Sequence, residues 1–126
     1  MEALKKTKIG KEIVEKIEQT ENVYIINLAI PDIRNGVDSD RNIYIDFGNI
    51  ESYAEGDYVP TLNEILLHEF THCVQLENNT WKTDPEGIWE NEIEACKNEN
   101  TYLKEIGDSR RRKIYKNTPL PASVWE

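Results

Sequence analysis

The chain has 126 residues, a formal net charge of −9 at pH 7 and a sequence pI of about 4.8. This length predicts one domain with a modest hydrophobic core. The acidic excess argues against nucleic acid and anionic membranes as partners. No apolar run approaches the roughly 18 residues of a membrane span, and residues 1–18 lack a signal-peptide core, so we expect a protein that is cytoplasmic or exported as part of a larger one.

The first part of the chain predicts a helix followed by two strands. Isoleucine recurs every four residues from Ile9 to Ile17, which is typical of an amphipathic helix. Residues 22–30 predict a buried strand, residues 32–42 have the composition of a loop, and residues 42–47 alternate as a second strand. Two interpretations of the second strand stay open: an edge strand that pairs with an extended peptide substrate, or an ordinary hairpin strand.

A further helix is predicted to begin at Thr61. Thr61 followed by Glu64 is the pattern of a capping box. The apolar side chains that follow share one stripe with a period of about 3.6 residues: Leu62, Leu66, Phe70, Cys73 and Val74. Glu64, Thr71 and Gln75 fall on the opposite face and are expected to face water.

This helix carries the sequence His68-Glu69-Phe70-Thr71-His72, an HExxH motif that contains both histidines of the chain. Residues four apart lie one above the other on a helix, so the two imidazoles can bind one metal ion. Glu69 is then close to a metal-bound water and can take its proton as a general base. The alternative is an accidental histidine pair on a surface helix.

A third metal ligand must be a carboxylate or a cysteine, because a catalytic zinc ion normally takes three protein ligands and no third histidine exists. Residues 87–106 predict a second long helix. Glu92 falls in its apolar stripe, where a carboxylate must be paired or bind a metal. Glu99 falls in the same stripe, whereas Glu90 and Glu94 fall on the polar face. We favour Glu92 as the ligand, with Glu99 and Glu94 as alternatives.

The two cysteines, Cys73 and Cys96, fall on the apolar stripes of the two helices. The position predicts small buried side chains. A disulfide or a zinc thiolate is the alternative.

The HExxH motif followed by Asn91-Glu92-Ile93-Glu94-Ala95 resembles the gluzincin metallopeptidases, in which a second helix carries the glutamate ligand, often as Asn-Glu or Glu-x-x-Ala. That family often has an acidic or amide residue four positions later, where it supports a histidine ligand, and this chain has Cys96 there. The chain is also similar to small zincin domains at the C-termini of bacterial polymorphic toxins and injected effectors, in Glu99-Asn100-Thr101-Tyr102, Gly107, Arg110 to Arg112 and Tyr115.

The resemblance implies an α+β, minimal zincin-like fold, with a small β-sheet packed on an active-site helix and a glutamate-bearing helix. It implies that His68, His72 and Glu92 bind Zn²⁺ and that Glu69 is catalytic.

A donor to the oxyanion must come from tyrosine or arginine, since both histidines are already used. Tyr102 is ten residues beyond Glu92, about 15 Å along the helix, which is too far. We therefore expect Tyr115 to be the donor. The basic run that precedes it, residues 110–113, is expected to be solvated.

Together these features predict a single domain, residues 1–126, that acts as a zinc metallopeptidase on a protein or peptide substrate, as in a bacterial toxin or effector. An immunity protein or a parent toxin polypeptide is then an expected partner. Two other functions stay open: an intracellular regulatory protease of the repressor-cleaving type, and a non-catalytic zincin-like binding module. The intact Glu69 argues against the module, because a structural metal site needs no general base.

Overall fold

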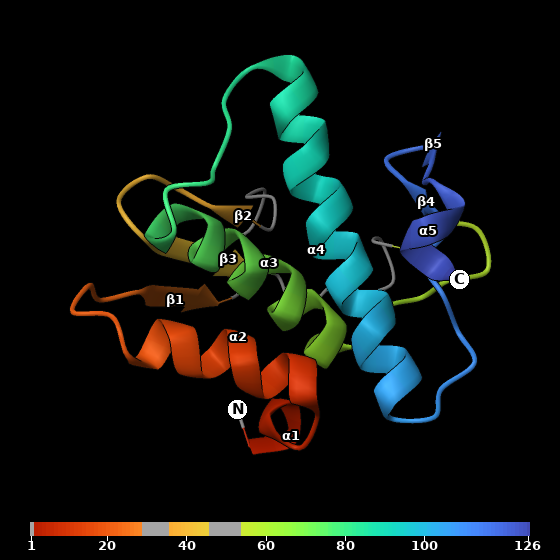
Figure 1. Ribbon diagram of the computed structural model, residues 1–126, viewed down its shortest axis with the longest axis horizontal. Helices are drawn as coiled ribbons and strands as arrows, with labels where there is room; N and C mark the ends of the chain where they lie inside the picture. The colour runs from red at the N-terminus through yellow and green to blue at the C-terminus, as the bar shows by residue number, and fades with distance from the viewer. Residues whose placement is uncertain (1, 29–35, 46–53) are drawn as a thin grey trace.

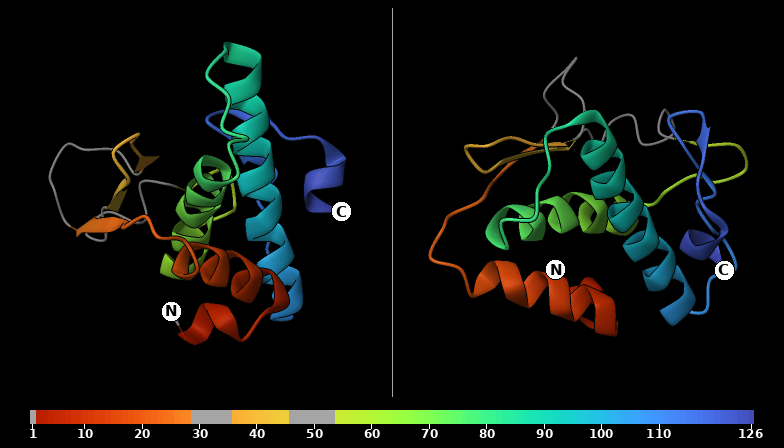
Figure 2. Two further views of the ribbon diagram at one scale, coloured as in Figure 1. Left: turned by 60° about the vertical axis from the view of Figure 1, so that its left-hand side comes forward. Right: turned by 45° about the horizontal axis from the view of Figure 1, so that its top comes forward.

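The computed structural model describes residues 2–28, 36–45 and 54–126, which form a mixed α+β structure (Figure 1). Helix α3 (Leu62–Glu77) lies at the centre, with the strands on one side, α2 (Lys8–Glu18) alongside, and α4 (Pro85–Glu105) crossing it on the other side (Figure 2). The C-terminal segment packs on the far side of α4. In the described part of the chain, no helix combines the length and the apolarity that a bilayer crossing requires.

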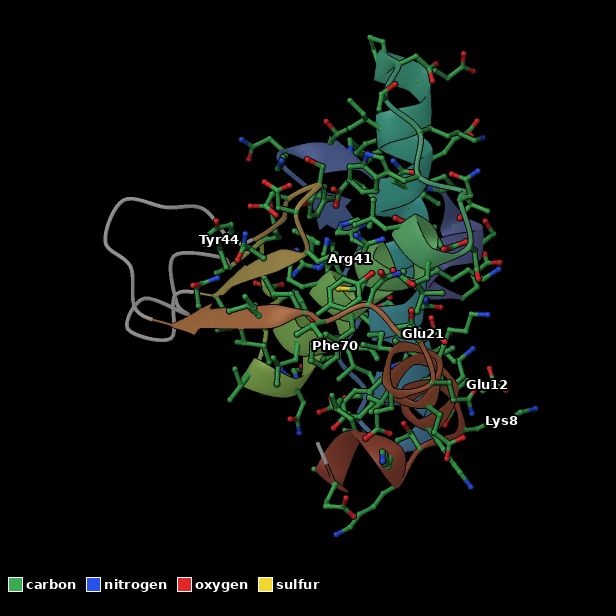
Figure 3. The ribbon with its side chains drawn as sticks, turned by 90° about the vertical axis from the view of Figure 1, so that its left-hand side faces the viewer. Lys8, Glu12, Glu21, Arg41, Tyr44 and Phe70 are labelled. Atoms are coloured by element: carbon green, nitrogen blue, oxygen red, sulfur yellow. The ribbon has the colours of Figure 1, made fainter. Side chains whose placement is uncertain are left out.

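The predicted N-terminal helix is confirmed as α2, and a short helix that was not predicted, α1 (Glu2–Lys5), precedes it. Thr7 caps α2 by accepting a hydrogen bond from the backbone N–H of Gly10 at 3.0 Å. A Cβ atom at Gly10 would lie 2.0 Å from the carbonyl oxygen of Leu4, so only glycine lets α1 fold back this closely. In Figure 3, Lys8 and Glu12 point outward from α2, whereas the buried Phe70 lies inside.

The described strands form a sheet in the order β1-β3-β2, from β1 (Ile25–Leu28), β2 (Gly36–Val37) and β3 (Asn42–Ile45). Strand β3 pairs in parallel with β1 and antiparallel with β2, so it is central. The edge-strand interpretation of the second predicted strand is therefore wrong, whereas the hairpin interpretation is confirmed, because β3 forms a hairpin with β2 through residues 38–41. No sequence pattern indicated β2, because a two-residue strand within a loop is too short to show a period.

The first strand is shorter and more exposed than residues 22–30 predicted. Val23 is 75% exposed and Ile25 55% exposed, whereas Ile43 and Ile45 of β3 are buried. An outer strand of a small sheet has neighbours on one side only, so an apolar sequence there does not guarantee burial. Residues 29–30 and 46–47, the predicted ends of the two strands, lie outside the described residues.

The start of α3 is confirmed, because Thr61 and Glu64 form the predicted capping box. The prediction that Glu64, Thr71 and Gln75 face water is wrong, since all three are buried. The strands, α2 and α4 surround this helix, so even its polar face is covered. Its polar side chains must then find partners inside the protein.

Helix α4 begins two residues earlier than predicted, where Asp84 accepts a hydrogen bond from the backbone N–H of Gly87. Ile88 and Ile106, at the two ends of this helix, are exposed. Cys73 and Cys96 are buried free thiols, as predicted, and burial raises the pKa of Cys73 to about 12.

The C-terminal segment folds back as a small hairpin and a short helix: β4 (Ile114–Tyr115), β5 (Thr118–Pro119) and α5 (Ala122–Trp125). Leu120 and Val124 form a second apolar cluster with Cys96 of α4. The basic run before the hairpin is not solvated throughout, because Arg112 is only 5% exposed. The expectation of a fully solvated run is therefore wrong at this position.

Candidate metal centre

His68 and His72, one turn apart on α3, face Glu92 on α4. The Nε2 atom of His68 lies 2.9 Å from Oε2 of Glu92, and the Nε2 atom of His72 lies 3.2 Å from Oε1 of the same carboxylate. Both histidines are buried, and the Glu92 side chain is 14% exposed. The structure therefore brings the three predicted metal ligands to one point between two helices.

The spacing of these donor atoms suits a small divalent cation. Tetrahedral zinc with bonds of about 2.0–2.2 Å places its ligand atoms roughly 3.3–3.6 Å apart. The two separations, 2.9 and 3.2 Å, lie a little below this range. Burial raises the pKa of Glu92, but hydrogen bonding and charge at His68 and His72 outweigh it, so the pKa lies well below its ordinary value. Glu92 is thus held as a carboxylate, the form that binds metal.

The ring nitrogen of His72 that does not face Glu92, Nδ1, is held by Gln75. Nδ1 of His72 donates to Oε1 of Gln75 at 2.8 Å. The amide of Gln75 in turn donates to the backbone carbonyl of Asn91 at 3.0 Å and to Oε1 of Glu94 at 3.1 Å. This bond places the proton on Nδ1 and leaves Nε2 with a lone pair for a metal ion.

The ring nitrogen of His68 that does not face Glu92, Nδ1, is held by Glu99. Nδ1 of His68 lies 2.8 Å from Oε2 of Glu99, and the Glu99 side chain is fully buried. The guanidinium Nε of Arg112 lies 3.1 and 3.2 Å from the two oxygens of this carboxylate. Burial raises the pKa of Glu99, and the stronger opposite effects of Arg112 and His68 lower it below its ordinary value.

A second group of possible ligand atoms, from His68, Cys96 and Glu99, also lies within 4.8 Å of one another. Arg112 makes this group a poor cation site, because the Glu99 carboxylate already neutralises a buried guanidinium that would repel a metal ion. Burial also raises the pKa of Cys96, which disfavours the thiolate. Of the two groups, His68, His72 and Glu92 is the better fit.

Glu69 directly follows His68 on α3 and is buried, and both histidines are close enough to affect the pKa of its carboxylate. Among the described residues, no hydrogen-bond partner reaches its Oε2 atom. Burial raises the pKa of Glu69, while His68 and His72 act in the opposite direction. A buried carboxylate oxygen without a protein partner is costly, and it suits a position that faces a water molecule.

Aromatic rings surround the two histidines. The ring of Tyr115 stacks on His68 with centroids 5.4 Å apart, and Trp81 meets His72 edge to face at 5.3 Å. Burial raises the pKa of Tyr115 and the nearby Glu92 adds to it, against the effect of His68, so its hydroxyl stays protonated. Tyr102 lies elsewhere and accepts a hydrogen bond from Asn63 at 3.1 Å.

Three residues of the site were not predicted in their observed positions: Gln75, Glu99 as a partner of His68, and Arg112. Gln75 follows His72 by three residues and Glu99 follows Glu92 by seven, so helical spacing could have indicated both. No local pattern marks Arg112, which reaches the site from the segment after α4.

Comparisons with protein-family models, curated proteins and solved structures found no match to this chain.

Proposed function

We propose that this protein is a zinc-dependent metallopeptidase that hydrolyses peptide bonds in a protein substrate. One observation carries the proposal: two imidazole Nε2 atoms and one carboxylate converge beside the buried Glu69, whose Oε2 atom has no partner in the described part of the chain. Three converging ligands with an adjacent base is the arrangement of a catalytic zinc site, whereas structural sites usually have four ligands.

The fold supports the same proposal. The HExxH helix α3 packs between a small sheet and the glutamate-bearing helix α4, which is the layout expected of a minimal zincin-like fold (Figure 2). The resemblance of residues 61–115 to gluzincins and to toxin and effector domains favours an extended stretch of protein as substrate. An immunity protein, or the remainder of a toxin polypeptide, would then be its binding partner.

In the proposed reaction, zinc held by His68, His72 and Glu92 would polarise the scissile carbonyl and acidify a water molecule. Glu69 takes one proton from this water as the water oxygen attacks the carbonyl carbon. When the C–N bond breaks, Glu69 gives the proton to the leaving amine, so the carboxylate is restored and one water is consumed. The raised pKa of Glu69 suits a group that both accepts and donates a proton.

Tyr115 is proposed to donate a hydrogen bond to the oxygen that gains negative charge during the attack. Its ring stacks on His68, and its protonated hydroxyl is near Glu92. Loss of this hydrogen bond is expected to lower turnover more than it weakens substrate binding.

The test combines metal analysis with a cleavage profile. Protein purified without chelators and supplied with Zn²⁺ should hold about one equivalent per chain. Glu69→Gln should keep this zinc and the fold, but its rate of cleavage of proteins in a proteome extract should fall by at least about 10³-fold. Glu90→Gln is the matched control, because Glu90 is exposed on α4 and pairs only with Lys82 among its described neighbours.

Two outcomes would count against the proposal. A zinc content below about a tenth of an equivalent per chain would exclude the proposed metal site. Normal zinc content with no cleavage by the wild-type protein, and equal behaviour of Glu69→Gln, would favour the non-catalytic binding module. Cleavage of a single repressor-like protein would instead support the regulatory protease.

A further inference from the structure

Arg112 is a buried cation outside the three proposed ligands, and it comes from the C-terminal segment. Its side chain is 6% exposed, and its Nε atom contacts both oxygens of Glu99. Glu99 in turn contacts Nδ1 of His68, whose Nε2 faces Glu92. Arg112, Glu99 and His68 thus form a continuous line of buried contacts from the C-terminal segment to the proposed metal ligands.

We propose that Arg112 is a positioning residue for the metal centre, acting on His68 through Glu99. The inference rests on the proposed zinc site. Arg112 holds the Glu99 carboxylate in place, and Glu99 fixes the ring of His68 with its Nε2 toward the metal. The segment after α4 is therefore part of the metal centre.

The need for Arg112 follows from the burial of Glu99. A fully buried carboxylate with no cation beside it would be strongly destabilised in this position and would turn away from it. A displaced Glu99 would no longer accept the hydrogen bond from Nδ1 of His68, which would weaken the hold on the imidazole. Arg112 prevents this change.

The backbone of Arg112 is anchored on α4. Its N–H donates to Oδ1 of Asn100 at 2.7 Å, and its carbonyl accepts from Nδ2 of Asn100 at 2.9 Å. The same amide donates to the carbonyl of Val124 at 2.9 Å. Asn100 thus fixes both Arg112 and the C-terminal segment relative to Glu99, which directly precedes Asn100 on α4.

The guanidinium of Arg112 also contacts two aromatic rings. Its guanidinium carbon lies 4.8 Å from the ring centroid of Tyr58 and 5.6 Å from that of Tyr115. Because Tyr115 also stacks on His68, Arg112 supports this imidazole through a carboxylate on one side and an aromatic ring on the other.

Arg110 provides a matched control from the same basic run. Its side chain is 34% exposed and pairs with Asp108 at 2.9 Å and with Glu64 at 3.0 Å. Within the described part of the chain, it forms no ion pair with Glu99. Loss of Arg110 removes an equal charge and a comparable ion pair at the start of α3, away from the line to His68.

The experiment measures zinc affinity by competition with a chromogenic chelator for Arg112→Gln, Glu99→Gln, the double variant and Arg110→Gln. We expect Arg112→Gln and Glu99→Gln each to weaken zinc binding by about 10–100-fold. The double variant should be no weaker than Glu99→Gln alone, because both changes break one line of contacts. Arg110→Gln should bind zinc within about twofold of the wild type.

Two further measurements separate positioning from general structure. The Tm of the metal-free proteins reports on folding alone, and the visible spectrum of the Co²⁺-loaded proteins reports on ligand geometry. Arg112→Gln should change the Co²⁺ spectrum, while Arg110→Gln should keep it even if its metal-free Tm falls. If Arg112→Gln does not fold, Arg112→Lys keeps the charge without the planar fork, and it should show a smaller loss of affinity.

The proposal is overturned if Arg112→Gln, or Arg112→Lys in its place, binds zinc with wild-type affinity and gives the wild-type Co²⁺ spectrum. It is also overturned if the losses of Arg112→Gln and Glu99→Gln add fully in the double variant. In both cases the wild-type protein still binds zinc, so the proposed function survives. Failure of the wild type itself to bind zinc would instead remove the proposed function.

Discussion

His72 and Gln75 are joined by a hydrogen bond of 2.8 Å between Nδ1 and Oε1, one turn apart on the same helix. The acceptor is an amide oxygen, so the imidazole is the donor and Nε2 is free for a metal ion. Gln75 is itself fixed by the carbonyl of Asn91 on α4, the residue before Glu92. The bond therefore links the orientation of one proposed ligand to the helix that carries another.

This bond predicts that Gln75→Leu weakens zinc binding by about 10-fold or more, because His72 loses its acceptor and its ring is no longer held. Gln75→Glu keeps an acceptor at the same place and should retain affinity much closer to that of the wild type. Chelator competition measures both. Equal losses for the two variants would mean that the contact with Asn91, and not the bond to His72, is what matters.

Glu92→Gln is predicted to weaken zinc binding by at least about 100-fold, because a neutral amide replaces a charged ligand. Glu90→Gln, two residues earlier on the exposed face, should bind like the wild type. Glu94 is a less suitable control than its position on the polar face suggested, because it accepts a hydrogen bond from Gln75. Isothermal titration with Zn²⁺ distinguishes these cases. A small effect at Glu92 would reopen the assignment of the third ligand.

Tyr115→Phe is predicted to lower kcat by about 10²–10³-fold with little change in KM, since the hydroxyl is proposed to act only on developing charge. Zinc content should be unchanged, because the aromatic ring that stacks on His68 is kept. Tyr102→Phe removes a hydroxyl that accepts from Asn63 instead, and should leave kcat unaltered. Steady-state kinetics on a peptide identified from the cleavage profile would test this, and full activity of Tyr115→Phe would exclude Tyr115 as the donor.

Glu77, at the end of α3, predicts an acid-sensitive contribution to stability. Its carboxylate accepts hydrogen bonds from Thr20, from Tyr24 at 2.5 Å and from Asn22 at 2.8 Å, and it pairs with Arg41 at 3.2 Å. In Figure 3, Arg41 lies between the strands and this helix. These hydrogen bonds, first those from Thr20 and Tyr24, lower the pKa of Glu77 from 4.5 to about 2.

Because the folded pKa is below the unfolded one, the contribution is complete above pH 4.5 or so and is lost as the pH falls toward about 2. Glu77→Gln should reduce the free energy of unfolding at pH 7 by about 1–3 kcal/mol. The difference between variant and wild type should shrink between pH 5 and pH 3, as measured by urea denaturation. Glu12→Gln, at an exposed position on α2, should show no such difference at any pH. A difference that does not depend on pH would contradict the prediction.

Features set by neighbouring residues could be predicted from the sequence. The capping box at Thr61 and Glu64, the helix around Ile9 to Ile17 and the helix that carries Glu92 depend on interactions within one or two turns. The relative position of His68 and His72 follows from the rise and twist of the helix alone. The mixed α+β class followed from the same local patterns.

Only the tertiary structure decided which polar groups are buried and what they contact. Gln75 looked solvent-facing on an isolated helix and is buried because α4 crosses over it. Strand β3 became central because β2 pairs with it from within a predicted loop. Arg112 reaches Glu99 from a segment that returns along α4 after the helix ends. Helical period and capping are local and leave a trace in the sequence, whereas burial and ion pairing depend on contacts between segments that are distant along the chain.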